Sequence, residues 1–315
     1  MARKIIIDTD PGQDDAVAII LALASPELEV LGLTTVAGNV PLARTQENAR
    51  IICQIAGRGD VAVYAGCDRP LMRDLVTAEH VHGKTGLDGV PLFQPAAPLA
   101  PGHAVDFIID TLRREAPGTV TLVPIGPLTN IATAFRKAPD IIARVQEIVL
   151  MGGAYFEVGN ITPAAEFNIY VDPEAAAEVF AAGVPLTVMS LDVTHKALTS
   201  RAWVEAMRES GPIGQAIASW TDFFERYDRE KYGSLGAPLH DPCTIGWLIR
   251  PDLFKGKHIN VVIETKGEFT QGMTVADWWG VSGRPANAMF ISDLDRDGFF
   301  DLLVQRVTAL DAAAR

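Results

Sequence analysis

Short apolar segments alternate with helical patterns along the first 190 residues, and this alternation restricts the fold more than any other feature. The segments that favour strands are residues 5–7, 29–37, 61–65, 119–124, 147–151 and 185–190, and the helical patterns between them cover 16–24, 41–56, 103–115, 128–137 and 173–182. Consecutive parallel strands need such helical crossovers, which then cover both faces of the sheet. We therefore predict an α/β fold, with an open, mostly parallel, doubly wound sheet and flanking helices.

Residues 200–250 predict a small helical cap beside this sheet. Two helices flank Gly211-Pro212, and a further helix runs from Ala237 to about residue 249. The tail predicts strands near 258–264, 272–278 and 286–292 and a last helix over 297–311. Because no segment has the composition of a linker, we expect residues 1–315 to form a single domain.

Charge and composition exclude several classes of partner. The formal net charge is −12 and no cluster of basic residues is large, so neither nucleic acid nor an anionic membrane surface is an expected partner. The three cysteines, Cys53, Cys67 and Cys243, are scattered and have no CxxC spacing, which indicates a reducing compartment and no thiolate metal site. The N-terminus leads straight into the first strand, and no apolar run approaches about 18 residues. We expect a cytoplasmic protein without a signal peptide.

Four carboxylates follow the first strand within eight residues: Asp8, Asp10, Asp14 and Asp15. Such a density of negative charge is repulsive unless a cation or a network of hydrogen bonds stabilises it. Asp14 and Asp15 gain some stabilisation at a helix N-terminus, and a hard metal ion with oxygen ligands would neutralise the rest. The alternative is that Asp8 is only a buried acid and that Asp14 and Asp15 only cap the helix.

Other residues with ligand-binding chemistry follow the remaining strands. They are Asn39 after the second strand, Ile125 after the strand at 119–124, and Asn160, Glu166 and Asn168 in a polar loop after Met151. In open parallel sheets ligands bind beyond the carboxyl ends of the strands, so these residues should meet the four acids at one edge. The long irregular segment 67–102 contains His82 and is also expected to be functional. This arrangement favours a hydrolase with a carboxylate-bound divalent cation and Asp10 as general base.

Motifs along almost the whole chain, in the same order, resemble those of the inosine–uridine-preferring nucleoside hydrolases. They cover residues 8–16, 34–39, 82–83, 123–130, 151–153, 165–168, 172–176, 191–195, 240–242 and 272–277. Such an ordered set is far more specific than a single Asp-rich turn. Residues 162–166 and 237–245 are most similar to the bacterial pyrimidine-preferring ribonucleoside hydrolases.

The resemblance implies that the chain cleaves the N-glycosidic bond of ribonucleosides to free base and ribose with a tightly bound Ca²⁺. By position, the metal ligands would be Asp10, Asp15, the carbonyl oxygen of Ile125, and Asp241. Asp10 would also deprotonate the metal-bound water. Direct attack by that water, without an enzyme nucleophile, implies inversion at the anomeric carbon. The family also forms homodimers or homotetramers, so a homo-oligomer is expected.

The same resemblance assigns the substrate contacts. The residues expected at the ribose and its surroundings are Asp14, Asn39, Asn160, Glu166, Asn168, Asp241, Met151 and Phe167. His82 and His240 match histidines near the nucleobase, where an imidazole would protonate the leaving base or hydrogen-bond to it. Phe223, Tyr227 and Tyr232 follow roughly helical spacing and favour a core-facing stripe, with Tyr227 the best candidate for a wall of the base pocket.

Other functions stay open at this point. A purine- or inosine-preferring or a non-specific nucleoside hydrolase would carry the same motifs. An Asp-dependent phosphohydrolase of the haloacid dehalogenase type also has Asp-x-Asp after its first strand, although Gly-Thr usually follows there in place of the Pro11-Gly12 found here. A non-catalytic nucleoside- or sugar-binding protein is the remaining alternative.

Overall fold

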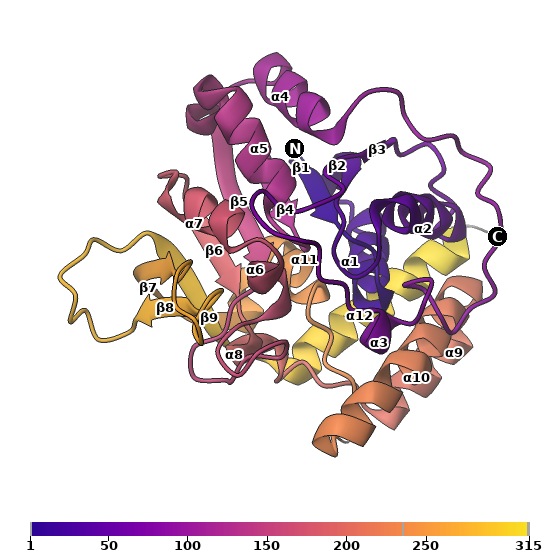
Figure 1. The fold of residues 1–315 in the computed structure, drawn as a ribbon. Helices are drawn as coiled ribbons and strands as arrows, with labels where there is room; N and C mark the ends of the chain where they lie inside the picture. The colour runs from indigo at the N-terminus through magenta and orange to yellow at the C-terminus, as the bar shows by residue number, and fades with distance from the viewer. Residues whose placement is uncertain (1, 235, 314–315) are drawn as a thin grey trace.

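The computed structural model describes residues 2–234 and 236–313. Within them the strands form one nine-stranded sheet in the order β3-β2-β1-β4-β5-β6-β9-β7-β8 (Figure 1). The strands are β1 (Arg3–Thr9), β2 (Leu28–Thr35), β3 (Val63–Ala65), β4 (Val120–Pro124), β5 (Val145–Met151), β6 (Leu186–Met189), β7 (Phe254–Ile263), β8 (Thr274–Asp277) and β9 (Ala288–Leu294). All neighbours pair in parallel except β7, which is antiparallel to both β8 and β9. The prediction of an open, mostly parallel sheet is confirmed.

The isoleucines of β1 illustrate how the sheet is covered on both faces. Ile5 and Ile7 pack into one core cluster and Ile6 into the other, because successive side chains of a strand point to opposite faces. The helices that contribute to the first cluster include α1 (Gln13–Leu23), α2 (Leu42–Ile55), α11 (Pro242–Ile249) and α12 (Arg296–Ala313), and those of the second include α4 (Ala104–Arg114), α5 (Thr129–Lys137) and α7 (Pro173–Ala181). The sheet is therefore doubly wound, as predicted.

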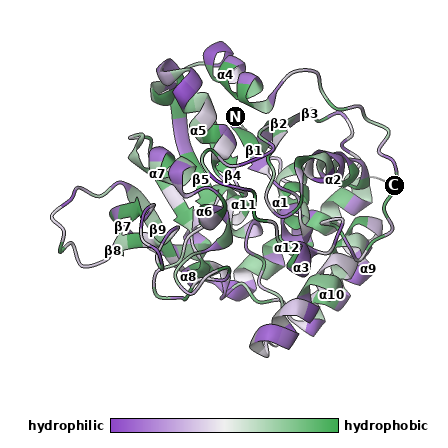
Figure 2. Cartoon of the chain, viewed as in Figure 1, coloured by the Kyte–Doolittle hydropathy of each residue, from purple (hydrophilic) through white to green (hydrophobic). Residues whose placement is uncertain are grey.

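Helix α1 is buried along its whole length. Its residues from Ala16 to Leu23 are all apolar, and Figure 2 shows this apolar colouring. A helix that is apolar on every side has no face to present to water and is stable only inside a core. Its N-terminus, with Asp14 and Asp15, is thereby held at the carboxyl end of β1.

Two helices, α9 (Arg201–Ser210) and α10 (Pro212–Tyr232), form the predicted cap and lie side by side (Figure 1). The buried Asp311 of α12 fixes their junction, because its carboxylate accepts hydrogen bonds from the backbone N–H groups of Ile213 and Gly214 at 2.9 and 3.1 Å. A Cβ atom at Gly211 would lie 2.5 Å from Asp311 Cγ, so only glycine fits there. The third predicted helix, α11, starts at Pro242 rather than at residue 237, and its buried hydrophobic side chains belong to the same core cluster as Trp203 of α9 and Trp220 of α10.

Short elements differ most from the prediction. The structure adds α3 (Glu79–His82) inside the irregular segment, α6 (Phe167–Val171) in the predicted polar loop, α8 (Leu191–Thr194) directly after β6, and two 3₁₀ turns, Pro139–Arg144 and Pro251–Leu253. Helices of four or five residues complete little more than one turn, so no periodic pattern can reveal them. None of the described helices has the length and apolar character needed to cross a membrane.

Candidate active site

Acidic side chains from two distant segments, the start of α1 and the residue before α11, meet beyond the carboxyl end of β1. Carboxylate oxygens of Asp14, Asp15 and Asp241 lie within 4.8 Å of one another, and all three residues are buried. Asp241 precedes α11 at its N-cap position, but its carboxylate makes no capping hydrogen bond there. The carboxylate is therefore directed to the cluster rather than to its own helix.

Asp10 lies beside this cluster in a cradle of glycines. Its Oδ2 accepts a hydrogen bond of 2.6 Å from the backbone N–H of Asn39. Cβ atoms added at Gly38 and Gly126 would lie 2.1 Å from Oδ2 and 2.3 Å from Oδ1, so side chains there would displace the carboxylate. Oδ1 is buried and has no hydrogen-bond partner within the described part of the chain. A buried carboxylate oxygen in that state indicates a bound ion or water.

Asp15 is oriented by three donors, which suits a fixed ligand. Its Oδ1 accepts from Thr9 Oγ1 at 2.6 Å, and its Oδ2 accepts from the backbone N–H of Gly12 at 2.9 Å and from Asn39 Nδ2 at 3.2 Å. Asn39 therefore contacts both Asp10 and Asp15 and fixes their relative positions.

The electrostatics of the carboxylate cluster favour the binding of a cation. Burial together with repulsion between the carboxylates raises the pKa of Asp14 to about 8 and the pKa values of Asp10 and Asp241 well above their ordinary range, and burial raises the pKa of Asp15. A divalent cation would remove this penalty by favouring the ionised forms. Because all the available ligand atoms are oxygen atoms, the residues fit a hard ion such as Ca²⁺ or Mg²⁺.

Asp8 is separate from this group and has a structural role. Its Oδ1 accepts hydrogen bonds from Thr34 Oγ1 at 2.6 Å and from Asn130 Nδ2 at 2.8 Å, which ties β1 to β2 and to α5. Burial raises its pKa to about 7. The alternative considered for Asp8, a buried acid below the site, agrees with these contacts.

The polar loop after β5 surrounds the next part of the pocket. Glu166 caps α6, because its carboxylate accepts hydrogen bonds from the backbone N–H groups of Asn168 and Ile169, and it also accepts one from the N–H of Gly153 after β5. Burial raises the pKa of Glu166 to about 7 against the opposite effect of these donors. Asn168 Nδ2 donates to the carbonyl oxygens of Ile125 at 3.1 Å and Met151 at 3.2 Å. The ends of β4 and β5 are thereby joined at the pocket.

The two histidines expected near the base are both buried. His82 Nδ1 lies 2.7 Å from Gln13 Oε1, and His240 Nδ1 lies 2.7 Å from Thr194 Oγ1 in α8. Burial lowers the pKa of His82 to about 3 and that of His240 well below its ordinary value. Both imidazoles are therefore neutral near pH 7.

One pocket collects nearly all of the predicted residues. Its predicted lining residues are Asp14, Asn39, His82, Ile125, Met151, Asn160, Glu166, Phe167, Asn168, Tyr227, His240 and Asp241. Asp10 and Asp15 have no exposed surface and lie below this lining, in contact with Asn39. The pocket also includes residues to which the sequence analysis assigned no role: Ala78, His80, Val81, Ile161, His195 and Phe224.

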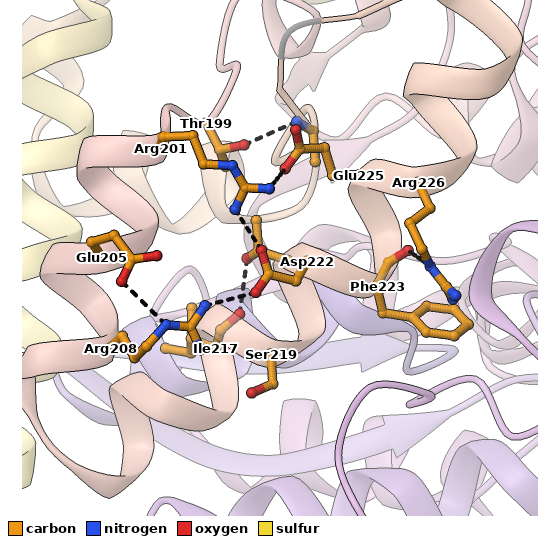
Figure 3. Close-up of polar contacts among 12 residues, drawn as sticks. Thr199, Arg201, Glu205, Arg208, Ile217, Ser219, Asp222, Phe223, Glu225 and Arg226 are labelled. Atoms are coloured by element: carbon orange, nitrogen blue, oxygen red, sulfur yellow. Dashed lines mark hydrogen bonds and ion pairs between the residues drawn. The ribbon is translucent and has the colours of Figure 1, made fainter.

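The aromatic wall comes from α10 but in a different register from the expected stripe. Phe224 and Tyr227 line the pocket, whereas the ring of Phe223 lies 3.9 Å from the guanidinium of Arg226 (Figure 3). The side chain of Tyr232 lies outside the described residues. The sequence could not decide between Phe223 and Phe224 as the partner of Tyr227, because spacings of four and of three residues both place two side chains on one face of a helix. The choice depends on which face of α10 is covered by α9.

Ion pairs hold α10 against α9 on its other side. Asp222 contacts Arg201 at 2.7 Å and Arg208 at 2.6 Å, and Glu225 contacts Arg201 at 3.1 Å (Figure 3). Two bridged arginines restrict rotation of α10 more than one exposed pair would. They thereby fix the side of the helix that presents Phe224 and Tyr227 to the pocket.

Comparison with known proteins agrees with this site. The chain is 53% identical over 309 residues to an uncharacterized protein of Schizosaccharomyces pombe, covering 98% of this chain and 99% of the relative. It is 48% identical over 309 residues, with the same coverage, to the pyrimidine-specific ribonucleoside hydrolase RihA of Salmonella paratyphi C. A purine-preferring ribonucleoside hydrolase from Gardnerella vaginalis superposes with a TM-score of 0.92 at 32% identity, over 99% of this chain and all of that one.

The family description "inosine-uridine preferring nucleoside hydrolase" matches residues 5–301. This match spans the acids after β1, the polar loop after β5 and Asp241, so it includes every element that forms the pocket. The chain belongs to the inosine–uridine-preferring nucleoside hydrolases and is a ribonucleoside N-glycosidase.

Proposed function

We propose that the protein hydrolyses the N-glycosidic bond of pyrimidine ribonucleosides, uridine and cytidine, to free base and ribose. The observation that carries the reaction is the buried carboxylate cluster at the floor of a pocket whose walls are polar on one side and aromatic on the other. The pyrimidine preference rests on the 48% identity to the pyrimidine-specific RihA. The purine-preferring neighbour of the same fold makes purine preference the second candidate.

The metal proposed here is Ca²⁺, held by Asp10, Asp15, Asp241 and the carbonyl oxygen of Ile125. The unpartnered Asp10 Oδ1 and the mutual repulsion of the acids support this set. When bound, the ion would hold the ribose 2′- and 3′-hydroxyls and make the attacking water more acidic. Asp14 shares the cluster and is assigned to the ribose hydroxyls.

Asp10 is proposed as the general base. The backbone N–H of Asn39 holds one oxygen of its carboxylate, which directs the other oxygen to the buried space where water would attack. A carboxylate with a raised pKa is a stronger base than a solvated one, provided that it is ionised. Without an enzyme nucleophile, direct attack inverts the anomeric configuration.

Ribose recognition is assigned to the walls beside the cluster. Asn39, Asn160, Glu166 and Asn168 present oxygen and amide groups to the pocket, and the Glu166 carboxylate is held in place by the N-terminus of α6. As the base departs, the ribosyl ring gains positive charge, which carboxylates stabilise. Met151 and Phe167 supply apolar contacts at the same wall.

The base is proposed to lie between the two histidines and the aromatic wall. Tyr227 and Phe224 provide a surface for stacking, as aromatic side chains do for nucleobases. His240, oriented by Thr194, is assigned to the leaving base, and His82 lines the same pocket with its ring stacked on Phe224. Since both imidazoles are neutral, they act through hydrogen bonds in the ground state.

We also propose that residues 1–315 act as a single domain and assemble as a homo-oligomer. The site draws on residues from Asp10 to Asp241, which supports one domain. Trp279 and Val281 in the β8–β9 loop are 78% and 88% exposed, and exposed apolar groups of this size favour a subunit contact.

Release of free base from uridine, cytidine, inosine and adenosine tests the proposal. Each nucleoside is incubated with the purified protein, with chelator-treated protein, and with chelator-treated protein to which Ca²⁺ or Mg²⁺ is returned. We expect chelator-sensitive release that Ca²⁺ restores, and faster release from the pyrimidine nucleosides. A preference for inosine would replace the pyrimidine assignment by the purine one. No release from any nucleoside by protein with measured Ca²⁺ would refute the hydrolase proposal.

A further inference from the structure

Gln13, the first residue of α1, lies in the turn that carries Asp10, Asp14 and Asp15 (residues 8–15, the acidic turn) and connects it to the segment that carries His82. Its Nε2 lies 2.9 Å from the carbonyl oxygen of His82 and 3.1 Å from that of Asp88. Carbonyl oxygens only accept hydrogen bonds, so the donating nitrogen of the amide must be on this side. The orientation of the Gln13 amide is therefore fixed by two partners, and its oxygen must point the other way.

That oxygen contacts the imidazole of His82. Gln13 Oε1 lies 2.7 Å from His82 Nδ1, and an amide oxygen can only accept. His82 Nδ1 must then carry a hydrogen atom. Because burial lowers the pKa of His82 to about 3, the ring has a single N–H near pH 7. The second nitrogen, Nε2, is left without a hydrogen and is a hydrogen-bond acceptor.

The ring cannot easily leave this orientation. Phe224 stacks on it with ring centroids 5.4 Å apart and an angle of 21° between the planes. On another side, a Cβ atom at Gly12 would lie only 2.4 Å from His82 Nδ1, so the turn before α1 closes on the ring. The ring edge opposite Gln13 carries Nε2, and His82 lines the pocket.

We propose that Gln13 is a positioning residue that holds His82 in the Nδ1–H tautomer, so that His82 Nε2 accepts a hydrogen bond from an N–H group of the nucleobase. The inference rests on the proposed nucleoside hydrolysis. It selects bases with a donor on the facing edge, such as N3–H of uracil or the 4-amino group of cytosine. His82 then binds the base through a hydrogen bond and, without a hydrogen on Nε2, does not protonate it.

Asn48 provides a matched control for the tether alone. Its buried Nδ2 also joins the acidic turn to the His82 segment, by hydrogen bonds to the carbonyl oxygens of Pro11 at 3.0 Å and Thr85 at 2.8 Å. Unlike that of Gln13, its side-chain oxygen has no partner among the described residues. Gln13→Met removes both the tether and the contact with the imidazole, whereas Asn48→Leu removes only a tether.

The tautomer is measured first, by ¹⁵N NMR of histidine-labelled protein, with the His82 signals assigned from the His82→Asn variant. We expect His82 to carry its hydrogen on Nδ1 in the unaltered protein and in Asn48→Leu, and to shift to the Nε2–H form in Gln13→Met. Gln13→Glu keeps the acceptor and should preserve Nδ1–H. A signal for Nε2–H in the unaltered protein would overturn the proposal whether or not any nucleoside is a substrate.

Kinetics then test the consequence for the base. The protein should use uridine at least 100-fold more efficiently than 3-methyluridine, which lacks N3–H. Gln13→Met should reduce this ratio at least tenfold, mainly through a higher KM for uridine, while Asn48→Leu should leave it unchanged. The same ratio in Gln13→Met as in the unaltered protein would refute the role in specificity. Failure to hydrolyse uridine at all would instead refute the proposed function, and the NMR result would stand separately.

Discussion

Replacing Asp192 by asparagine should loosen one wall of the pocket without touching its acidic floor. The buried Asp192 carboxylate in α8 accepts hydrogen bonds from three consecutive backbone N–H groups, at residues 155, 156 and 157, with distances of 2.9, 2.6 and 3.0 Å. It accepts a fourth from Ser190 Oγ at 2.9 Å. The same loop leads to Asn160, which lines the pocket.

The size of the effect follows from these four donors. A hydrogen bond to a charged acceptor contributes about 1.5–3 kcal/mol and one between neutral groups about 1 kcal/mol. Asparagine offers a single oxygen, so at least one donor loses its acceptor and the others keep only neutral bonds. We expect the anchor to weaken by about 2–4 kcal/mol. At 1.4 kcal/mol for each factor of ten, exchange of these three amide hydrogens should accelerate about 30- to 700-fold.

Hydrogen exchange measures how often the loop opens, and steady-state kinetics measure the consequence for substrate binding. A loop that is closed for less of the time lowers the apparent affinity, so KM for uridine should rise about tenfold while kcat changes little. Asp277→Asn is the matched control, because Asp277 accepts from the backbone N–H groups of Val281 and Ser282, both at 2.8 Å, in the β8–β9 loop. That variant should release its own loop and leave KM unchanged.

Two results would refute the reasoning about Asp192. If exchange at residues 155–157 is unchanged in Asp192→Asn, the carboxylate does not anchor the loop. If exchange accelerates but KM stays the same, the loop is anchored by Asp192 without contributing to substrate binding.

Three further results are expected. Asp10→Asn should lower kcat about 10²- to 10⁴-fold at saturating Ca²⁺, the usual contribution of a general base. Uridine should exceed 2′-deoxyuridine in kcat/KM by about 100-fold or more, because the deoxy sugar leaves buried polar groups unpaired. Burial raises the pKa of Glu166 from 4.5 to about 7, so its contribution favours folding at low pH and is lost as the pH rises through 7. The stability of Glu166→Gln relative to the unaltered protein should therefore rise by about 3 kcal/mol between pH 4.5 and above 7.

Each of these expectations has an outcome that would contradict it. Retained kcat in Asp10→Asn, with a normal Ca²⁺ content, would assign the base to another group. Equal hydrolysis of both sugars would exclude recognition of the 2′-hydroxyl. For Glu166→Gln, denaturant unfolding is measured in chelator at each pH, and Glu264→Gln serves as the control because Glu264 is a loop acid whose pKa is lowered rather than raised. A pH-independent difference for Glu166→Gln would contradict the raised pKa.

The fold was predictable where the chain has long periodic segments. Alternating strands and helices up to residue 190 led to the parallel sheet, and the Gly211-Pro212 break correctly separated α9 from α10. The antiparallel pairing of β7 was not predictable, because no local pattern states which neighbour a strand chooses. The short helices α3, α6 and α8 were missed for a related reason, since their stability comes from capping and from contacts with distant residues.

The site was likewise predictable where its residues are close together in the sequence, and not where their contacts join distant parts of the chain. The acids of the first turn were recognisable because strand, turn and helix are consecutive, so a few residues suffice to place Asp10, Asp14 and Asp15 together. Gln13 lies in the same turn and was overlooked, because its meaning comes from His82, 69 residues further along the chain. A single glutamine has no chemistry of its own to attract attention. Its role follows only from the three atoms around its amide. Two carbonyl oxygens accept from Nε2, so the third atom, His82 Nδ1, must donate to Oε1. These three atoms meet Gln13 only in the folded chain.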